Sequence, residues 1–324
     1  MYSSSELRDL VNSRLAASPY LHQPQGLYDP INYVLSIGGK RIRPILLLMA
    51  YNLYHENIHP AILPAIAIET YHNYTLLHDD LMDRADMRRG KLTVHKKWND
   101  NTAILSGDSM LVLAYQKMQQ CDDKYLRPVL ELFTDTALEI GEGQQYDMEF
   151  ETRMDVKEEE YIEMIRLKTS VLLACALKTG AILANAPEED AHYLYKFGES
   201  IGLAFQLQDD FLDVYGDPSV FGKKIGGDIL CNKKTYMLIQ AWNLADSQLR
   251  QELEHWLTAT SFEPQEKINA VTDIYNKVGI DKLCQLKIEQ YFSKGEEYLK
   301  KVKVDEEQKT MLRTFSTSLL GRKS

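Results

Sequence analysis

The chain has 324 residues, 44% of them hydrophobic, and a formal net charge of −10. A chain of this length can bury a substantial core, either in one large domain or in two ordinary ones. The acidic balance argues against a nucleic acid as the general partner, because a phosphate backbone attracts basic proteins. Basic residues near any anion site must therefore be local.

Turn residues are sparse, with 17 glycines and 10 prolines, and no regular series of short alternating strands is visible. We therefore predict an all-α fold in which residues 1–324 form a single helical domain. The N-terminus shows no basic region followed by an apolar core, and the longest apolar stretch, residues 45–50, is too short to cross a bilayer. The four cysteines form no Cys-x-x-Cys pair, a pattern typical of free thiols in a reducing compartment. We expect a cytoplasmic protein without a transmembrane segment.

The first part of the chain shows helical spacing of apolar residues over 5–16 and again over 27–36. The glycine pair that follows, Gly38 and Gly39, permits backbone conformations closed to other residues. Just before the next helix lie three cations: Lys40, Arg41 and Arg43. Together with the positive pole of that helix they would form an anion site. The alternative is a basic surface turn that only caps a neighbouring helix.

A helix predicted over residues 60–83 ends in the first aspartate cluster, which consists of Asp79, Asp80 and Asp83. On a helix the first and last of these share one face, while Asp80 points elsewhere. Carboxylates so placed repel one another and face the negative pole of the helix dipole. A bound cation would remove both conflicts.

A polar loop over residues 84–95 follows and carries Arg88 and Arg89. Their planar guanidinium groups suit bidentate contacts with phosphate, and both lie within ten residues of Asp79. They could therefore reach a phosphate held by metal ions at the cluster.

Three more helices are predicted in the middle of the chain, over 100–120, over 123–149 and from about 157 to 183. Asp155 is the expected N-cap of the third. That helix carries Lys168 and Thr169 in an otherwise apolar stretch. A lysine there is also compatible with a surface residue whose charged head reaches water.

The next helix, predicted over 189–214, carries the second aspartate cluster, which consists of Asp209, Asp210 and Asp213. Two facing clusters with this spacing could hold several divalent ions, and magnesium prefers such oxygen ligands together with substrate phosphates. A single acidic helix end is often only solvated, but two copies after apolar helical runs favour the metal site. The long loop over 215–235, with Lys223, Lys224, Lys233 and Lys234, is interpreted as a lid. Residues 236–320 show the periodicity of about four shorter helices.

A di-iron bundle is the alternative metal site, because paired Glu-x-x-His sequences mark such bundles. The pattern occurs four times, but only Glu69 and His72 share a helix with an aspartate cluster. The other three copies lie in an apparent loop or in strongly polar stretches. The iron content of the purified protein would separate the two hypotheses.

With these residues in place, the chain closely resembles the trans-type isoprenyl diphosphate synthases, which include farnesyl and geranylgeranyl diphosphate synthases. The resemblance runs in order from Gly38 to about Lys234 and rests on the glycine pair with its cations, both aspartate clusters, Arg88-Arg89-Gly90, Lys168-Thr169 and Gln206. It implies a bundle of mostly antiparallel helices around a deep cavity, a homodimer, and magnesium as the cofactor, with three ions when substrate is bound.

The resemblance also assigns roles by position. The main magnesium ligands would be Asp79, Asp83 and Asp209, with Asp80, Asp210 and Asp213 nearby or acting through water. The allylic diphosphate would be held by Arg88, Lys168, Thr169, Gln206, Lys223 and Lys233, with Lys224 and Lys234 as the alternative register of the two lid lysines. Isopentenyl diphosphate would be held by Lys40, Arg43, His72 and Arg89.

The implied reaction breaks the allylic carbon–oxygen bond, and metal ions with Lys and Arg groups stabilise the departing diphosphate. Tyr74 and Thr75, five and four residues before Asp79, would face down the cavity below the metals. In the family a bulky aromatic at the position of Tyr74 resembles short-chain enzymes, so we predict a C15 or C20 product. Tyr74 could instead only pack between helices.

Two hypotheses from other classes remain. A class I terpene cyclase would use similar metal chemistry on one diphosphate and would not need the receptor at Lys40 and Arg43. A non-catalytic partner subunit of a prenyl synthase should lack one aspartate cluster, whereas this chain has both. Dependence of turnover on isopentenyl diphosphate, and activity of the isolated protein, would discriminate.

Overall fold

The computed structural model describes residues 1–217 and 225–321. The fold is all-α, as the sequence predicts, and the strands of the described part are confined to one two-stranded antiparallel hairpin, β1 (Met87–Arg88) with β2 (Lys91–Leu92). In this part of the chain no helix has both the length and the apolar character that crossing a membrane requires. Contacts divide the chain into two compact units, which we describe separately.

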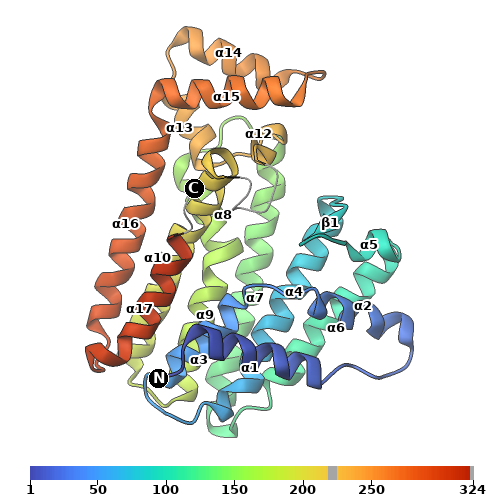
Figure 1. Ribbon diagram of the computed structural model, residues 1–324, viewed down its shortest axis with the longest axis vertical. Coiled ribbons are helices and arrows are strands. Elements are labelled where there is room, and N and C mark those ends of the chain that lie inside the picture. Colours follow the sequence, from blue (N-terminus) through green and yellow to red (C-terminus); the bar gives the residue numbers. More distant parts are fainter. Residues whose placement is uncertain (218–224, 322–324) are drawn as a thin grey trace. The chain divides into compact units, whose positions relative to one another are not determined.

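The first unit comprises Met1–Asp135, Cys175–Tyr195 and Val302–Leu312. Its complete elements (Figure 1) are α1 (Ser4–Ala17), α2 (Gln25–Ser36), α3 (Ile42–Asn52), the 3₁₀ helix η1 (His59–Ala61), α4 (Ile62–Met82), the β1–β2 hairpin, α5 (Val94–Lys97) and α6 (Asp100–Met118). The helices predicted over 5–16, 27–36, 60–83 and 100–120 are thereby confirmed to within two residues at either end.

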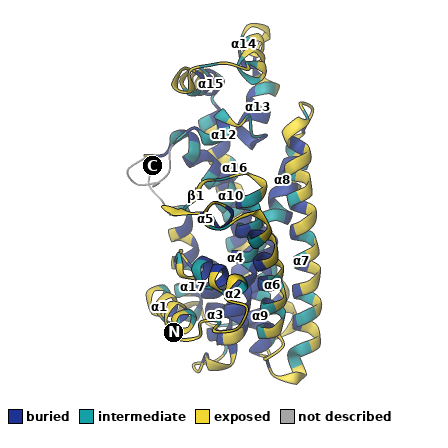
Figure 2. Ribbon diagram, turned by 90° about the vertical axis from the view of Figure 1, so that its right-hand side faces the viewer, coloured by how far each residue is buried: buried dark blue, intermediate teal, exposed yellow. Residues whose placement is uncertain are grey.

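The core of the first unit forms around α3 and α4. Helix α3 is apolar on nearly every side and is buried along its length, as its dark colour in Figure 2 shows. A helix that is hydrophobic all round belongs in a core, not at a surface. Helix α4 packs against α3 and shares this core.

The turn before α3 has left-handed backbone at Gly38, Gly39 and Arg41, with φ angles of 87°, 144° and 52°. Arg41 then points inward, and its Nη1 lies 2.6 Å from Glu69 Oε1 with both side chains almost fully buried. Arg41 therefore does not add charge to an anion site, contrary to the expectation from sequence. Its charge is neutralised inside the unit, because a buried guanidinium needs a carboxylate partner.

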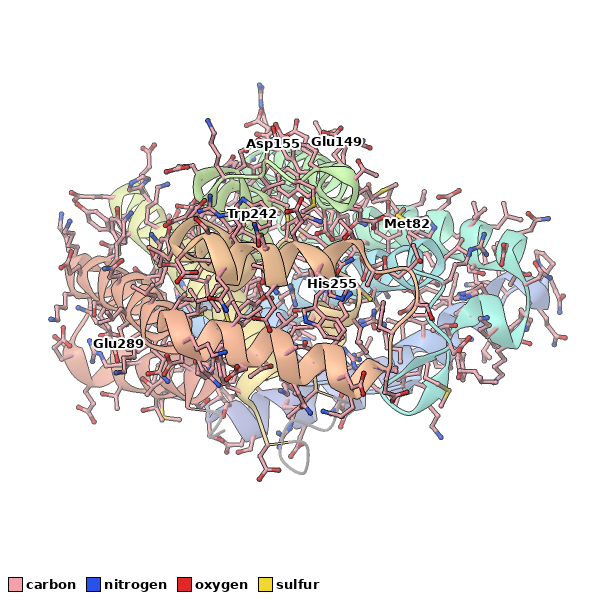
Figure 3. The ribbon with its side chains drawn as sticks, turned by 90° about the horizontal axis from the view of Figure 1, so that it is seen from above. Met82, Glu149, Asp155, Trp242, His255 and Glu289 are labelled. Atoms are coloured by element: carbon pink, nitrogen blue, oxygen red, sulfur yellow. The ribbon has the colours of Figure 1, made fainter. Side chains whose placement is uncertain are left out.

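The second unit comprises Thr136–Ala174, Lys196–Lys301 and Arg313–Ser324. Its complete elements are α8 (Glu158–Ile165), the π-helix η2 (Arg166–Ser170), α12 (Gly227–Leu230), α13 (Tyr236–Leu244), α14 (Ser247–Thr258), α15 (Pro264–Val278) and α16 (Ile280–Lys301). Four helices have residues in both units: α7 (Asp123–Thr152), α9 (Val171–Leu183), α10 (Glu188–Tyr215) and α17 (Glu306–Leu320). Helices α14 and α15 lie side by side, with His255 on α14 (Figure 3).

The π-helix η2 interrupts the helix predicted from about 157 to 183 and carries Lys168 and Thr169. Two glycines allow neighbouring helices to approach it closely. A Cβ at Gly143 of α7 would lie 2.3 Å from the backbone nitrogen of Lys168, and a Cβ at Gly202 of α10 would lie 2.6 Å from Ser170 Cα. Single-turn π-helices occur often at functional sites, and here two helices fix one in place.

Four local predictions are wrong. The N-cap of α8 is Lys157 and not Asp155. The exposed Asp155 carboxylate (Figure 3) accepts from Arg153 Nε at 2.9 Å. The loop over 84–95 contains the β1–β2 hairpin and the start of α5, and the loop over 215–235 contains the short helix α12. In the described part, residues 236–320 form five helices, α13 to α17, where four were expected.

Candidate active site

The first aspartate cluster lies at the C-terminal end of α4, where burial separates its members. Asp80 is buried, with 6% of its surface exposed, and accepts from Arg88 Nε at 2.7 Å. Asp79 is partly exposed, Asp83 is exposed, and the two share a face of the last turn. Arg88 Nη2 also lies 3.7 Å from Asp79 Oδ2. One arginine thus holds the buried carboxylate, while the outer two carboxylates reach the surface.

The electrostatics of Asp80 follow from this arrangement. Burial raises the pKa of the Asp80 carboxyl, and the bond from Arg88 opposes that rise. Arg88 comes from strand β1 of the hairpin, so the hairpin brings its guanidinium back to the helix end. The two strands therefore have a function in the site that the sequence pattern did not reveal.

A second group of cations gathers around the turn at Gly38 and Gly39. Arg89 Nη1 donates to Gly38 O, and Arg43 Nη1 donates to His72 Nε2 at 3.0 Å. Burial, followed by the fields of Arg43 and Arg89, lowers the pKa of His72 well below its ordinary value. His72 is therefore neutral at pH 7 and able to accept that bond.

Arg43 of this group is poorly solvated, whereas Arg89 is exposed. Burial lowers the pKa of Arg43 to about 10, and Arg43 Nε is buried without a hydrogen-bond partner in the described residues. Lys40 is exposed beside them at the turn. A set of cations at the N-terminus of α3, one of them desolvated, suits an anion. The predicted receptor residues of this unit thus lie together, with Arg41 excluded.

The second aspartate cluster, on α10, repeats the arrangement of the first. Asp210 is buried, with 3% of its surface exposed, and accepts from Tyr161 Oη and, at 2.9 Å, from Gln206 Nε2. Asp209 and Asp213 are only partly buried. Burial raises the pKa of Asp210 to about 7 against the opposing effect of Lys233. In both clusters the middle carboxylate is held by donors and the outer two are accessible.

The π-helix places Lys168 and Thr169 among acceptors of the second unit. Lys168 Nζ donates to Asp147 Oδ2 at 2.6 Å, and Thr169 Oγ1 donates to Gln206 Oε1 at 3.0 Å. Gln206 in turn bonds Asp210. A continuous hydrogen-bonded series from Thr169 through Gln206 to Asp210 therefore joins the π-helix to the second aspartate cluster.

The segment after α10 returns to the second cluster. The backbone N–H of Asp228 donates to Asp213 Oδ2 at 2.9 Å, and Lys233 Nζ lies 3.8 Å from Asp228 Oδ1. Lys234 is buried, and its Nζ donates to the backbone oxygens of Asn232 at 3.0 Å and of Glu151 at 3.4 Å. Of the two lysines considered as diphosphate ligands, Lys233 and Lys234, it is therefore Lys233 whose ammonium lies near Asp228. Lys223 and Lys224 lie outside the described residues.

The donor set fits a hard divalent cation. Every group that either cluster presents is a carboxylate, and magnesium takes one or two carboxylates together with phosphate oxygens and water. Within residues 1–217 and 225–321, no three His, Cys, Asp or Glu side chains gather closely enough to hold a metal ion by themselves. Each cluster supplies two outer carboxylates four residues apart on one helical face.

The predicted chain-length residues lie one turn before the first cluster. The Tyr74 ring packs against the rings of His78 and Tyr71, with centroids 4.9 Å and 5.4 Å away. Thr75 Oγ1 donates to His72 O at 2.9 Å. Tyr74 is partly buried and borders an apolar cluster formed by α2, α4, α5 and α6.

The Glu-x-x-His pair on α4 is engaged by donors. Glu69 Oε1 accepts from Arg41 Nη1 at 2.6 Å and from Asn73 Nδ2 at 3.0 Å, and His72 Nε2 accepts from Arg43. These atoms are the ones that a di-iron site would need. Both side chains are therefore already engaged by neighbouring donors, which argues against a di-iron site on this pair.

Three residues of the site were missed by sequence reasoning: Asp147, Tyr161 and Asp228. Asp147 ends the polar stretch Gly143-Gln144-Gln145-Tyr146-Asp147, which was a usable signal. Tyr161 and Asp228 have no local signal, because their partners lie 49 and 15 residues away in the chain.

A family model described as polyprenyl synthetase matches residues 24–275. A geranylgeranyl diphosphate synthase from Methanosarcina mazei is 36% identical over 302 residues, which covers 93% of this chain and 91% of the relative. A crystal structure of a geranylgeranyl pyrophosphate synthase superposes with a TM-score of 0.95 at 44% identity and covers 100% of both chains.

A third comparison concerns a solved complex. The geranylgeranyl pyrophosphate synthase from Corynebacterium glutamicum, in complex with isoprenyl diphosphate and magnesium, superposes with a TM-score of 0.85 at 26% identity, covering 99% of this chain and 98% of the other. The family model spans well over half of the 324 residues. The chain therefore belongs to the polyprenyl synthetase family of prenyl-transferring enzymes.

Proposed function

We propose that the protein is a magnesium-dependent short-chain prenyltransferase that joins isopentenyl diphosphate head-to-tail to dimethylallyl, geranyl or farnesyl diphosphate. The product is a C15 or C20 prenyl diphosphate for isoprenoid biosynthesis. The observation that carries the proposal is the repeated arrangement of the aspartate clusters, each with a buried, hydrogen-bonded middle carboxylate and two accessible outer ones. The relatives named above are geranylgeranyl diphosphate synthases, which agrees with this product range.

The metal ligands are proposed to be Asp79, Asp83 and Asp209, with Asp80, Asp210 and Asp213 nearby or acting through water. Three magnesium ions are expected with substrate bound, and when bound they neutralise the charge that develops on the leaving diphosphate. The complex of the Corynebacterium glutamicum enzyme with isoprenyl diphosphate and magnesium supports this choice of metal.

The allylic diphosphate is proposed to lie against donors from three places. The hairpin supplies Arg88, which already bridges to Asp79 and Asp80. The π-helix and α10 supply Lys168, Thr169 and Gln206, and the segment after α10 supplies Lys233. Lys223 belongs to the proposed set and lies outside the described residues. These donors stabilise charge on oxygen as the carbon–oxygen bond breaks.

Isopentenyl diphosphate is proposed to bind at the turn before α3, on Lys40, Arg43, His72 and Arg89. The desolvated guanidinium of Arg43, with Nε lacking a partner among the described residues, supports an anion there. A terpene cyclase acts on one diphosphate and would have no use for this second receptor. The receptor thus favours a synthase over a cyclase.

The reaction proceeds without a covalent protein nucleophile in this proposal. The allylic carbon–oxygen bond breaks to leave a carbocation, and the double bond of isopentenyl diphosphate attacks it. A proton is then lost from the new chain, and the departed diphosphate is the base that takes it. The protein holds the two diphosphates apart and in order, which supplies much of the catalysis by positioning.

The length of the prenyl product is proposed to depend on Tyr74 and Thr75, because the aromatic ring of Tyr74 borders the apolar residues of α2, α4, α5 and α6.

We also propose that both compact units act as one functional domain over residues 1–324. The homodimer is supported by an exposed apolar stripe on α6, where Ile104, Leu105 and Val112 are 44%, 60% and 66% exposed.

A cytoplasmic location remains part of the proposal. No disulfide joins cysteines in residues 1–217 and 225–321, which suits a reducing compartment. Small-molecule diphosphates are the expected partners, with no role for nucleic acid, because the chain carries a net charge of −10.

The direct test is incubation of the purified protein with labelled isopentenyl diphosphate, magnesium and each allylic primer in turn. We expect elongation with at least one primer, complete dependence on isopentenyl diphosphate, and loss of turnover when magnesium is chelated. Turnover of an allylic diphosphate alone to a hydrocarbon would instead indicate a cyclase. No turnover of any pair by the isolated protein would indicate a partner subunit.

A further inference from the structure

The second unit contains a lysine that is fully buried and has neutral partners. Lys267, on α15, has 0% of its surface exposed. Its Nζ donates to Asn232 Oδ1 at 2.7 Å and to Leu230 O at 3.5 Å, and it lies 4.3 Å from the centroid of the Phe262 ring. Burial lowers the pKa of Lys267. Taking an ammonium out of water costs free energy unless the structure uses the charge, so its place in the fold needs a reason.

The partner of Lys267 is the centre of a tight turn. Asn232 has a left-handed backbone, with φ of 53°, and follows the short helix α12. Its side-chain nitrogen donates to Leu257 O at 3.0 Å, and its backbone oxygen accepts from the buried Lys234 Nζ at 3.0 Å. Two ammonium groups therefore bond Asn232, one at its side chain and one at its backbone. A non-glycine residue persists in this conformation only when its surroundings fix it.

The turn leads directly to the proposed diphosphate ligand. The backbone N–H of Lys233 donates to Asp228 O at 2.9 Å, and Lys233 Nζ lies 3.8 Å from Asp228 Oδ1. The Asp228 N–H in turn bonds Asp213 of the second aspartate cluster at 2.9 Å. A continuous set of contacts thus runs from Lys267 through Asn232 to Lys233 and the cluster.

We propose that Lys267 is a positioning residue, which fixes the Asn232 turn and thereby the place of the Lys233 ammonium beside the second aspartate cluster. The inference rests on the proposed function, because it takes Lys233 as a ligand of the allylic diphosphate. Lys267 itself touches neither substrate nor metal. Its loss weakens the hold on the diphosphate and leaves the reacting groups in place.

The test compares Lys267→Met with wild type in two measurements, steady-state kinetics and calorimetric binding of inorganic pyrophosphate with magnesium. Methionine keeps the length and apolar stem of lysine and removes the ammonium. We expect KM for the allylic diphosphate to rise about tenfold while kcat stays within about twofold, and pyrophosphate to bind about tenfold more weakly. An unchanged KM in a folded Lys267→Met protein overturns the inference.

A double-mutant cycle with Lys233→Met separates positioning from general destabilisation. If Lys267 acts through Lys233, then KM of the double variant equals that of Lys233→Met within about twofold. Increases that multiply would show that Lys267 acts by another route and would overturn the inference. The matched control is Lys309→Met, which removes another buried ammonium, 2% exposed and bonded to Glu306 Oε1 at 2.8 Å. It should lower the melting temperature without changing KM.

A second variant decides the matter if Lys267→Met does not fold. Asn232→Gly keeps the left-handed turn, since glycine adopts it freely, and removes the acceptor of the Lys267 ammonium. It should raise KM as Lys267→Met would, and an unchanged KM overturns the inference. If wild type binds pyrophosphate but turns over no primer pair, the proposed function fails while the binding comparison still tests Lys267.

Discussion

At the scale of single residues, burial divides the aspartates of each cluster into two kinds. The middle aspartates are buried: Asp80 accepts from Arg88, and Asp210 accepts from Tyr161 and Gln206. The outer aspartates reach the surface. A buried carboxylate is costly unless donors satisfy it, so the middle aspartate of each cluster helps to fix the last turns of its helix. The outer aspartates are partly or fully exposed, so a cation from solvent can reach them.

Tyr74 allows a prediction about product length. Its ring lies between those of His78 and Tyr71 and borders the apolar residues of α2, α4, α5 and α6. Tyr74→Ala removes the ring and opens space there, so the product should lengthen by at least one isoprene unit. Chromatography of the dephosphorylated products measures this. Tyr193→Ala, at a surface tyrosine bonded to Glu189 at 2.9 Å, is the control and should not change the product. An unchanged product in Tyr74→Ala would show that Tyr74 only packs between helices.

His72 allows a prediction about pH. Burial and four neighbouring arginines lower its pKa in the folded state, while the unfolded chain keeps the ordinary value near 6.5. Below that pH the unfolded state binds a proton that the folded state refuses, so acid destabilises the fold. The destabilisation grows as the pH falls below 6.5, with a limiting slope of about 1.4 kcal/mol per pH unit. Denaturant unfolding of wild type and His72→Gln between pH 7 and pH 5 should show a smaller decline in the variant, and equal declines would contradict the prediction.

At the scale of elements, the π-helix shows how two helices fix the segment that carries the proposed diphosphate ligands Lys168 and Thr169. Because Gly143 has no side chain, α7 approaches the backbone nitrogen of Lys168 closely; a Cβ added at Gly143 would lie 2.3 Å from that nitrogen. Gly143→Ala should therefore displace the π-helix, lower the stability by about 1–3 kcal/mol and reduce turnover. Gly141→Ala is a matched control on the same helix, because a Cβ there meets nothing within 4 Å. It should leave turnover unchanged and stabilise by about 0.5–1 kcal/mol, since alanine favours a helix. Thermal melts and turnover assays measure both, and equal effects of the two variants would contradict the prediction.

The sequence predicted the helices of the first unit well, because their apolar spacing is strong and breakers mark their ends. It could not predict that Arg41 turns inward, since that depends on Glu69, which lies 28 residues away. Arg43, His72 and Arg89 were predicted together by resemblance, and they do lie around one turn of the first unit. The π-helix was missed because nothing in the residues around Lys168 distinguishes it from an α-helix. The Lys267 contacts join residues 35 and 37 positions apart and leave no local pattern.

At the scale of the whole molecule, the proposed chemistry requires the first and second aspartate clusters to act on the same diphosphate. Each cluster belongs to its own compact unit. The charges favour an arrangement in which both clusters act on one diphosphate. Several divalent ions accompany a bound diphosphate, and the two outer carboxylates of a single cluster balance only part of their positive charge. The proposed function therefore depends on both clusters.

Binding of pyrophosphate with magnesium tests this requirement without any turnover. Asp79→Ala and Asp209→Ala should each weaken binding by about tenfold or more, because each removes a proposed metal ligand. If both clusters hold one metal–pyrophosphate assembly, losing either one dismantles it, and the double variant should bind within about twofold of the weaker single variant. Asp155→Ala, at an exposed carboxylate bonded to Arg153, is the control and should bind like wild type. Calorimetry and a thermal melt of each variant provide the measurement. Losses that multiply in the double variant would mean that the two clusters bind separate ions, and the proposal that they act on one diphosphate would then have to be abandoned.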